Sequence, residues 1–198
     1  MIKLIIFDLN GVCYTDEEEP YKKKLSERSG IDFETVSEVF DKFIIKAETV
    51  EISGIEAWEK IKETLCIQGD TREMIREMYS VKKEIKETLE TIKTLKKKYD
   101  VAFLTSLCKE HCEEFSRRFD WKKYFDFGIA SYQIKTRKPN PKAYQAVMDH
   151  FGVKPEETVF VDDSEKNAKG AENICIHAIH LKDVSELKEL LRKNGVEI

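Results

Sequence analysis

The sequence predicts an α/β fold in which a parallel sheet is covered by helices on both faces, together with a separate helical segment. Short runs rich in Ile, Val and Phe recur along the chain, and most are continuous rather than alternating, as expected for buried strands. Helical patterns lie between these runs. Residues from about 15 to 80, in contrast, hold several helical patterns and no convincing buried strand.

Five apolar runs are the expected strands of the sheet, namely residues 2–7, 101–104, 127–130, 158–161 and 174–179. Two helices between them have clear signals. Ile85, Leu89, Ile92 and Leu95 recur at helical spacing. A second helix is expected to begin near Pro141 and to end before Gly152, because proline favours the first turn and glycine the position just past the end.

The segment from about residue 15 to residue 80 is expected to form a small all-helical unit beside the sheet. An apolar stripe from Phe33 to Phe43 indicates one helix, and Trp58 belongs to a second that follows a capping-box-like Ser53 and Glu56 pair. Asp70 followed by Glu73 indicates a third helix start. We expect Trp58 and the stripe to form the core of this unit, and the acidic run from Asp16 to Glu19 to be solvated.

Composition narrows the classes of function. Hydrophobic residues make up 41% of the 198 residues and charged residues 36%, and the net charge of 34 − 38 = −4 gives no electrostatic reason to expect a nucleic-acid partner. The apolar runs are too short to cross a membrane, and the N-terminus lacks the features of a signal peptide. Five cysteines without a disulfide-like spacing favour reduced thiols, so we expect a cytoplasmic protein. Cys108, His111 and Cys112 lack the paired spacing of zinc sites.

Carboxylates and hydroxyls follow three of the predicted strands. Asp8 comes directly after the first, Thr105 and Ser106 after the second, and Asp162 and Asp163 after the fourth. Each is also an ordinary helix-capping choice when taken alone. Because the carboxyl ends of parallel strands meet at one edge of a sheet, we expect these side chains to lie close together.

Crowded carboxylates need a cation. The stretch KTRKPNPKAY brings Lys135, Arg137 and Lys138 to a neighbouring loop just before a helix. Three carboxylates at one edge repel one another, and a Mg²⁺ ion with oxygen ligands relieves the repulsion and can bind a phosphate.

These residues resemble the motifs of the haloacid dehalogenase (HAD) superfamily, in the subclass with a helical cap after the first strand. FDLNGV resembles the first motif, LTS at residues 104–106 the second, KPNPKAY from Lys138 the third and VFVDDSEKN the fourth. The resemblance implies a Rossmann-like parallel-sheet core, formed by residues 1–14 and 82–198, with a helical cap formed by residues 15–81.

The resemblance also implies the roles of the strand-end residues. Asp8 is the expected nucleophile, which takes a phosphoryl group from a small phosphorylated metabolite and is then freed by water. Thr105 and Ser106 are expected to hold phosphate oxygens, and Lys138 to neutralise Asp8 and the transferring group. The remaining cations of the loop, Lys135 and Arg137, are expected to be surface charges.

The implied metal is Mg²⁺. Its expected ligands are the Asp8 carboxylate, the backbone carbonyl of Asn10 and the Asp163 carboxylate. Asp162 is expected to act through a metal-bound water or to take over the role of ligand.

Position 10 departs from the family pattern. Phosphatases of this family carry a second Asp there, which protonates the leaving group and later activates water, whereas this chain has Asn10. The amide has nearly the same shape but cannot transfer a proton, and general acid–base catalysis is worth about 10²–10⁴ in rate. Asn10 is either an engineered substitution, a natural feature of a slow or regulatory protein, or a site of deamidation, to which Asn-Gly is prone.

Two other functions remain open at this point. A 2-haloacid dehalogenase also uses an Asp nucleophile and a Lys, needs no metal and is compatible with Asn10, but it does not explain the Asp162-Asp163 pair. A non-enzymatic binding or regulatory protein would bind metal and phosphate without turnover. The Asn10-Gly11 pair is in addition typical of a tight turn, which here would lead from the first strand into the cap.

Overall fold

The predicted strands form one parallel sheet in the computed structural model, which describes all 198 residues. The sheet order is β3-β2-β1-β4-β5, so that β1 lies at the centre. The strands are β1 (Leu4–Phe7), β2 (Asp100–Thr105), β3 (Phe127–Ala130), β4 (Thr158–Asp162) and β5 (His177–His180). The predicted α/β fold class is confirmed, although β5 begins later than residue 174 because the chain turns at residues 173–175 with Cys175 at a φ of 66°.

Both faces of the central strands are buried. Leu4 and Ile6 of β1 pack on one face with helix α8 (Pro141–Phe151), while Ile5 and Phe7 point to the other face. That second face is covered by α5 (Lys86–Leu95) and α10 (Leu187–Lys193), which supply Leu89, Ile92, Leu187 and Leu191. The edge strands β3 and β5 are only partly buried.

The helix signals at both ends of α8 are confirmed. The Asn140 side chain accepts a hydrogen bond from the backbone N–H of Lys142, and Pro141 opens the helix. Gly152 ends it in the left-handed conformation with a φ of 65°. The remaining core helices are α6 (Lys109–Arg118), α7 (Ser131–Ile134) and α9 (Glu165–Glu172), with short 3₁₀ turns at residues 121–123, 155–157 and 184–186.

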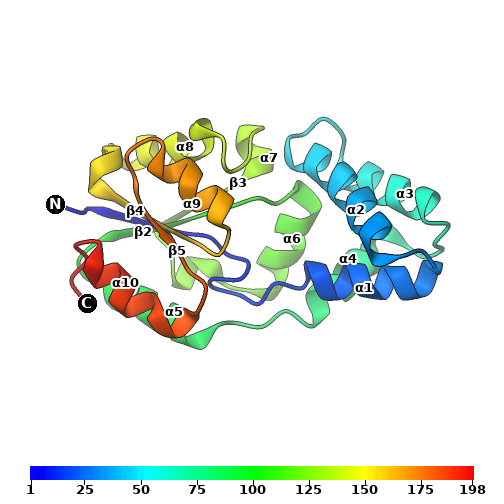
Figure 1. Ribbon diagram of the computed structural model, residues 1–198, viewed down its shortest axis with the longest axis horizontal. Helices are drawn as coiled ribbons and strands as arrows, with labels where there is room; N and C mark the ends of the chain where they lie inside the picture. Colours follow the sequence, from blue (N-terminus) through cyan, green and yellow to red (C-terminus); the bar gives the residue numbers. More distant parts are fainter.

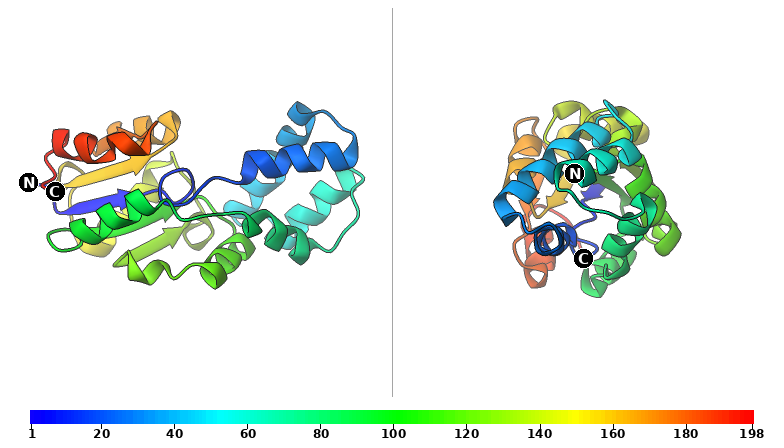
Figure 2. Two further views of the ribbon diagram at one scale, coloured as in Figure 1. Left: turned by 90° about the horizontal axis from the view of Figure 1, so that it is seen from below. Right: turned by 90° about the vertical axis from the view of Figure 1, so that its right-hand side faces the viewer.

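Four helices lie beyond one end of the sheet, away from both chain termini (Figures 1 and 2). They are α1 (Glu18–Ser29), α2 (Phe33–Glu48), α3 (Gly54–Thr64) and α4 (Thr71–Ser80). The Ser53 side chain accepts from the Glu56 N–H at 3.0 Å, and the Asp70 side chain from the Glu73 N–H at 2.9 Å, so both predicted helix starts are present. We refer to α1–α4 as the cap; its division from the rest of the chain at residues 15 and 81 stays a prediction.

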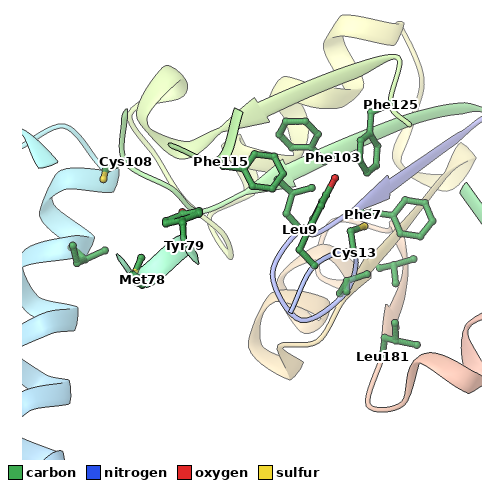
Figure 3. Packing of buried hydrophobic residues seen from close by; sticks show 14 of the residues in the cluster. Phe7, Leu9, Cys13, Met78, Tyr79, Phe103, Cys108, Phe115, Phe125 and Leu181 are labelled. Carbon is green, nitrogen blue, oxygen red and sulfur yellow. The ribbon is translucent and has the colours of Figure 1, made fainter. Parts of the chain in front are cut away.

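The cap is joined to the sheet through α6. The Trp58 Nε1–H of the cap donates to His111 Nε2 of α6 at 2.9 Å, and the Gly54 N–H donates to the Glu110 carboxylate at 3.1 Å. One apolar cluster continues across this junction, and Figure 3 shows its side chains running from Met78 and Tyr79 toward Leu9. These contacts hold the cap over the edge of the sheet where β1, β2 and β4 end. None of the helices combines the length and apolar character needed to cross a bilayer.

Candidate active site

Three neighbouring strands deliver the predicted side chains to one edge of the sheet. In the registers of β1 with β2 and β4, Phe7 pairs with Phe103 and with Val161. Asp8 follows β1, while Thr105 and Asp162 are the last residues of β2 and β4. The Asp8 N–H continues the ladder by donating to the Val161 carbonyl at 2.8 Å. The predicted convergence of these side chains is therefore present in the structure.

Lys138 is the buried cation of this edge. Its Nζ lies 2.8 Å from Asp8 Oδ1 and 2.6 Å from Asp162 Oδ2, and the residue is only 3% exposed. Burial raises the pKa of Asp8 to about 7, although Lys138 opposes the shift. Burial disfavours the Lys138 ammonium, but the carboxylates of Asp8 and Asp162 outweigh it and raise the pKa of Lys138. The ammonium thus balances two carboxylates that have left water.

The adjacent residues Asp162 and Asp163 differ in what they contact. Asp162 is fully buried, and besides Lys138 it accepts hydrogen bonds from the Ser164 N–H at 2.8 Å and from Asn167 Nδ2 at 3.2 Å. Asp163 is exposed and makes no such side-chain contacts. Oxygens of Asp8, Asp162 and Asp163 all lie within 4.8 Å of one another. The sequence did not identify Asn167 as a site residue, although Asn167 lies in the same VFVDDSEKN stretch as both aspartates.

The loop after Asp8 turns tightly around Gly11. Gly11 has a φ of 73°, and the N–H groups of Cys13 and Tyr14 both donate to the Leu9 carbonyl, so the predicted turn is present. A Cβ on Gly11 would lie 1.9 Å from Asp163 Oδ2, so only glycine allows this carboxylate to approach the loop so closely. The Oδ1 atom of Asn10 is buried without a hydrogen-bond partner.

A pocket of about 420 Å³ lies between the sheet edge and the cap. From the sheet edge it is lined by predicted site residues that include Asp8, Asn10, Thr105, Ser106, Lys138 and Asp163. From the cap it is lined by Glu18, Lys22, Asp41, Ile44, Ile45 and Glu48. Its volume suits a small molecule, and its walls are predominantly polar.

One expectation from the sequence is wrong at this pocket. Arg137 is not a simple surface charge, because its Nε lies 3.0 Å from Oε2 of the buried Glu48 and its side chain lines the pocket. In the acidic run, Asp16 and Glu19 are exposed as expected, while Asp16 and Glu18 also line the pocket. Arg and Glu are usually exposed, so their identities gave no sign of this placement. Lys135 lies outside the pocket lining.

The cap side of the pocket is acidic. Lys22 is held there by Asp41 at 2.5 Å and Glu18 at 3.6 Å. Burial raises the pKa of Glu48 to about 8, although Arg137 opposes the shift. The Glu48 carboxyl has therefore lost water without gaining enough hydrogen-bond donors to replace it.

Known proteins resemble the chain along nearly its whole length. A curated relative from Thermotoga maritima, named phosphorylated carbohydrates phosphatase, is 26% identical over all of this chain and 94% of its own length. Bifunctional epoxide hydrolase 2 of Sus scrofa is 25% identical, but the chain spans only 40% of that protein. A HAD family enzyme from Bacteroides thetaiotaomicron, solved in complex with magnesium and inorganic phosphate, has a TM-score of 0.78 at 26% identity, covering 94% of this chain and 99% of that one.

The family comparison agrees with the geometry. The model of the haloacid dehalogenase-like hydrolases matches residues 2–174, which contain the whole sheet edge with Asp8, Thr105, Lys138 and Asp163. The chain belongs to the haloacid dehalogenase-like hydrolase family.

Proposed function

We propose that the protein is a Mg²⁺-dependent phosphatase-like hydrolase that acts on a small phosphorylated metabolite, and that Asn10 limits its rate. The observation that carries this proposal is the contact of Lys138 with both Asp8 and Asp162 at the floor of a polar pocket, beside the exposed Asp163. The name of the Thermotoga relative and the magnesium and phosphate bound to the Bacteroides enzyme support the same reading.

The residues present fit a magnesium ion. Carboxylates are the hard oxygen ligands that Mg²⁺ prefers, and one oxygen of each of the three aspartates lies within 4.8 Å of the others. Asp8, Asp163 and the backbone carbonyl of Asn10 are the proposed ligands. Both Asp162 oxygens already accept hydrogen bonds, so we assign Asp162 to holding Lys138 in place. Bound Mg²⁺ supplies positive charge that neutralises phosphoryl oxygens and their anionic surroundings.

The proposed reaction uses Asp8 as the nucleophile. Its carboxylate attacks phosphorus, the bond to the leaving oxygen breaks, and an aspartyl-phosphate forms that water then hydrolyses. Lys138 holds positive charge 2.8 Å from the attacking carboxylate, and Thr105 and Ser106 line the pocket beside it as donors for phosphate oxygens.

Asn10 is expected to slow this reaction because it cannot transfer a proton. The leaving alkoxide must gain a proton, and the attacking water must lose one, but an amide does neither. We therefore expect the protein to bind phosphate esters and to turn them over slowly unless the leaving group is stable as an anion.

The test compares the protein with an Asn10→Asp variant on an activated aryl phosphate and a panel of phosphosugars, with and without Mg²⁺. The variant is expected to hydrolyse phosphosugars about 10²–10⁴-fold faster than the protein with Asn10, and EDTA is expected to abolish this gain in rate. Halide release from 2-haloacids without metal would instead identify a dehalogenase. Binding of metal and phosphate analogues without turnover, even in the variant, would indicate a regulatory protein.

The preparation itself needs one control, because deamidation would create Asp at position 10. The hydrogen bonds that pin residues 9–14 are expected to slow this reaction. Intact-protein mass and peptide mapping across Phe7 to Tyr14 measure any deamidated fraction.

A further inference from the structure

A second pocket lies where the cap meets the rest of the fold. Its volume is about 170 Å³, less than half of the 420 Å³ of the pocket at the sheet edge, and the two pockets share no lining residue. Its walls come from α3 and α4 of the cap and from α6, which lies between the cap and the sheet (Figure 1). We call it the junction pocket, and its lining includes Ile55, Arg72, Ile75, Arg76, Glu110 and Glu113.

The cap wall of the junction pocket carries two arginines without partners. Arg72 and Arg76 are exposed and lie four residues apart on α4, so that both project from the same face of the helix. Neither forms an ion pair or a hydrogen bond with another residue of the chain. The third arginine of the pocket differs, because the Arg117 guanidinium donates to the Glu114 carboxylate at 2.6 and 2.9 Å. Two guanidinium groups are therefore free to bind an anion.

The α6 wall of the junction pocket is acidic. Glu110 accepts the Gly54 N–H through Oε2 at 3.1 Å, and its Oε1 atom accepts no hydrogen bond. Glu113 is exposed and has only Lys109 nearby, at 3.8 Å. No nitrogen of the two free arginines lies within the 4.0 Å of a carboxylate oxygen that defines an ion pair. The positive and negative walls thus border one pocket without contacting each other.

The junction pocket also contains an apolar surface. Ile55 and Ile75 are its two hydrophobic lining residues, and Ile75 is almost fully buried. An apolar group that covers them is stabilised by leaving water. The pocket therefore combines free positive charge, free negative charge and an apolar contact in a volume suited to a small molecule.

A zwitterion with an apolar group matches all three features. Its carboxylate accepts hydrogen bonds from guanidinium groups, and its ammonium donates to carboxylates. Inorganic phosphate would satisfy the arginines but would be repelled by Glu110 and Glu113, and a polyamine would satisfy the glutamates but would be repelled by the arginines. An uncharged apolar molecule would use neither wall.

We propose that the junction pocket binds an α-amino acid with an apolar side chain. The carboxylate of the ligand contacts Arg72 and Arg76, its ammonium contacts the acidic wall of α6, and its side chain covers Ile75. The ligand then bridges the cap and α6 and stabilises the docking of the cap. This site goes beyond the proposed hydrolysis and does not depend on it, because none of its residues lines the pocket at the sheet edge.

The experiment titrates the full chain with L-leucine by calorimetry, without Mg²⁺ or phosphate, and saturable binding is expected. Two analogues each remove one charge: 4-methylpentanoate lacks the ammonium, and L-leucinamide lacks the carboxylate. Each is expected to bind about 10-fold more weakly or less, because each leaves one charged wall without a partner. Glycine keeps both charges but lacks the side chain, so it is also expected to bind more weakly than leucine.

The double variant Arg72→Gln, Arg76→Gln locates the site. Both residues are exposed, so the variant is expected to fold and to bind leucine about 10-fold more weakly or less. The matched control is Arg192→Gln, which removes an exposed arginine from α10, outside the pocket, and is expected to leave the affinity unchanged.

Absence of saturable leucine binding by the parent protein overturns the proposed site. Equal affinities for leucine and either of its two charge-deleted analogues do so as well, as does an affinity that the double variant leaves unchanged. Hydrolysis by the Asn10→Asp protein tests the proposed function separately, so that either conclusion can fail without the other.

Discussion

The two sides of the pocket are built in different ways. At the sheet edge, Asp8 follows β1, Asp162 ends the neighbouring β4, and Lys138 lies between their carboxylates at 2.8 and 2.6 Å. On the cap side, Glu48 and Arg137 come from separate parts of the fold, and each keeps an unpaired polar atom. The comparison teaches that the charges of the edge are brought together by neighbouring strands, whereas the contact of Glu48 with Arg137 depends on how the cap docks on the sheet.

The largest effect is expected at the sheet edge. Asp8→Asn removes the proposed nucleophile while keeping its shape, so hydrolysis of every phosphate ester is expected to fall by roughly 10⁴-fold or more. Steady-state assays on an aryl phosphate and a phosphosugar measure this loss, which is expected to be similar for both. A loss confined to one substrate would assign Asp8 to specificity and would erase the distinction between the two sides.

The next largest expected effect is a loss of folding stability when the buried cation of the sheet edge is removed. Lys138→Met leaves the buried carboxylates of Asp8 and Asp162 without their cation, which is expected to cost about 3–5 kcal/mol of unfolding free energy. Urea denaturation in EDTA measures the cost. Arg137→Met on the cap side is the matched comparison, with a smaller expected loss because the Arg137 side chain is 34% exposed. Equal losses would contradict the view that only the edge is preassembled.

The smallest expected effect is a pH-dependent loss of stability at the junction between the cap and the sheet. Burial lowers the pKa of His111 from 6.5 to about 4, because the imidazole is enclosed and accepts the Trp58 N–H. Between pH 6.5 and pH 4, His111 therefore binds a proton in the unfolded chain but not in the folded protein. As the pH falls from 6.5 toward 4, this site is expected to lose about 3 kcal/mol of stability.

His111→Gln isolates that contribution. The Gln side chain can still accept a hydrogen bond but does not titrate, so its unfolding free energy is expected to change less between pH 7 and pH 4 than that of the parent protein. Chemical denaturation at a series of pH values compares the two. Identical pH dependence would show that His111 is not sealed in the junction.

Much of the sheet edge could be predicted from the sequence, because its determinants are local. The apolar runs that end at Phe7 and Val161 identify buried strands, and a residue that follows a buried parallel strand lies at the ligand-binding edge. The capping residues Ser53 and Asp70 similarly marked helix starts that the structure contains.

The cap side could not be predicted in the same way. Glu48 is the last residue of a helix and Arg137 stands in a lysine-rich loop, and in both settings a charged residue is ordinarily solvated. Their contact depends on how the cap docks on the sheet, which is decided by long-range contacts such as Trp58 with His111. The spacing of Cys108, His111 and Cys112 likewise gave no sign that His111 would receive a hydrogen bond from the cap.

The central claim is that the sheet edge, with Mg²⁺ bound, provides the nucleophile and the positive charge for phosphoryl transfer, and that only the proton donor at position 10 is missing. The most direct measurement is the dependence of kcat/KM on the pKa of the leaving group, for a series of aryl and alkyl phosphates, in the protein and in Asn10→Asp. The account predicts a steep decline with rising leaving-group pKa for the protein and a shallow one for the variant. Equally steep declines in the two proteins would contradict it.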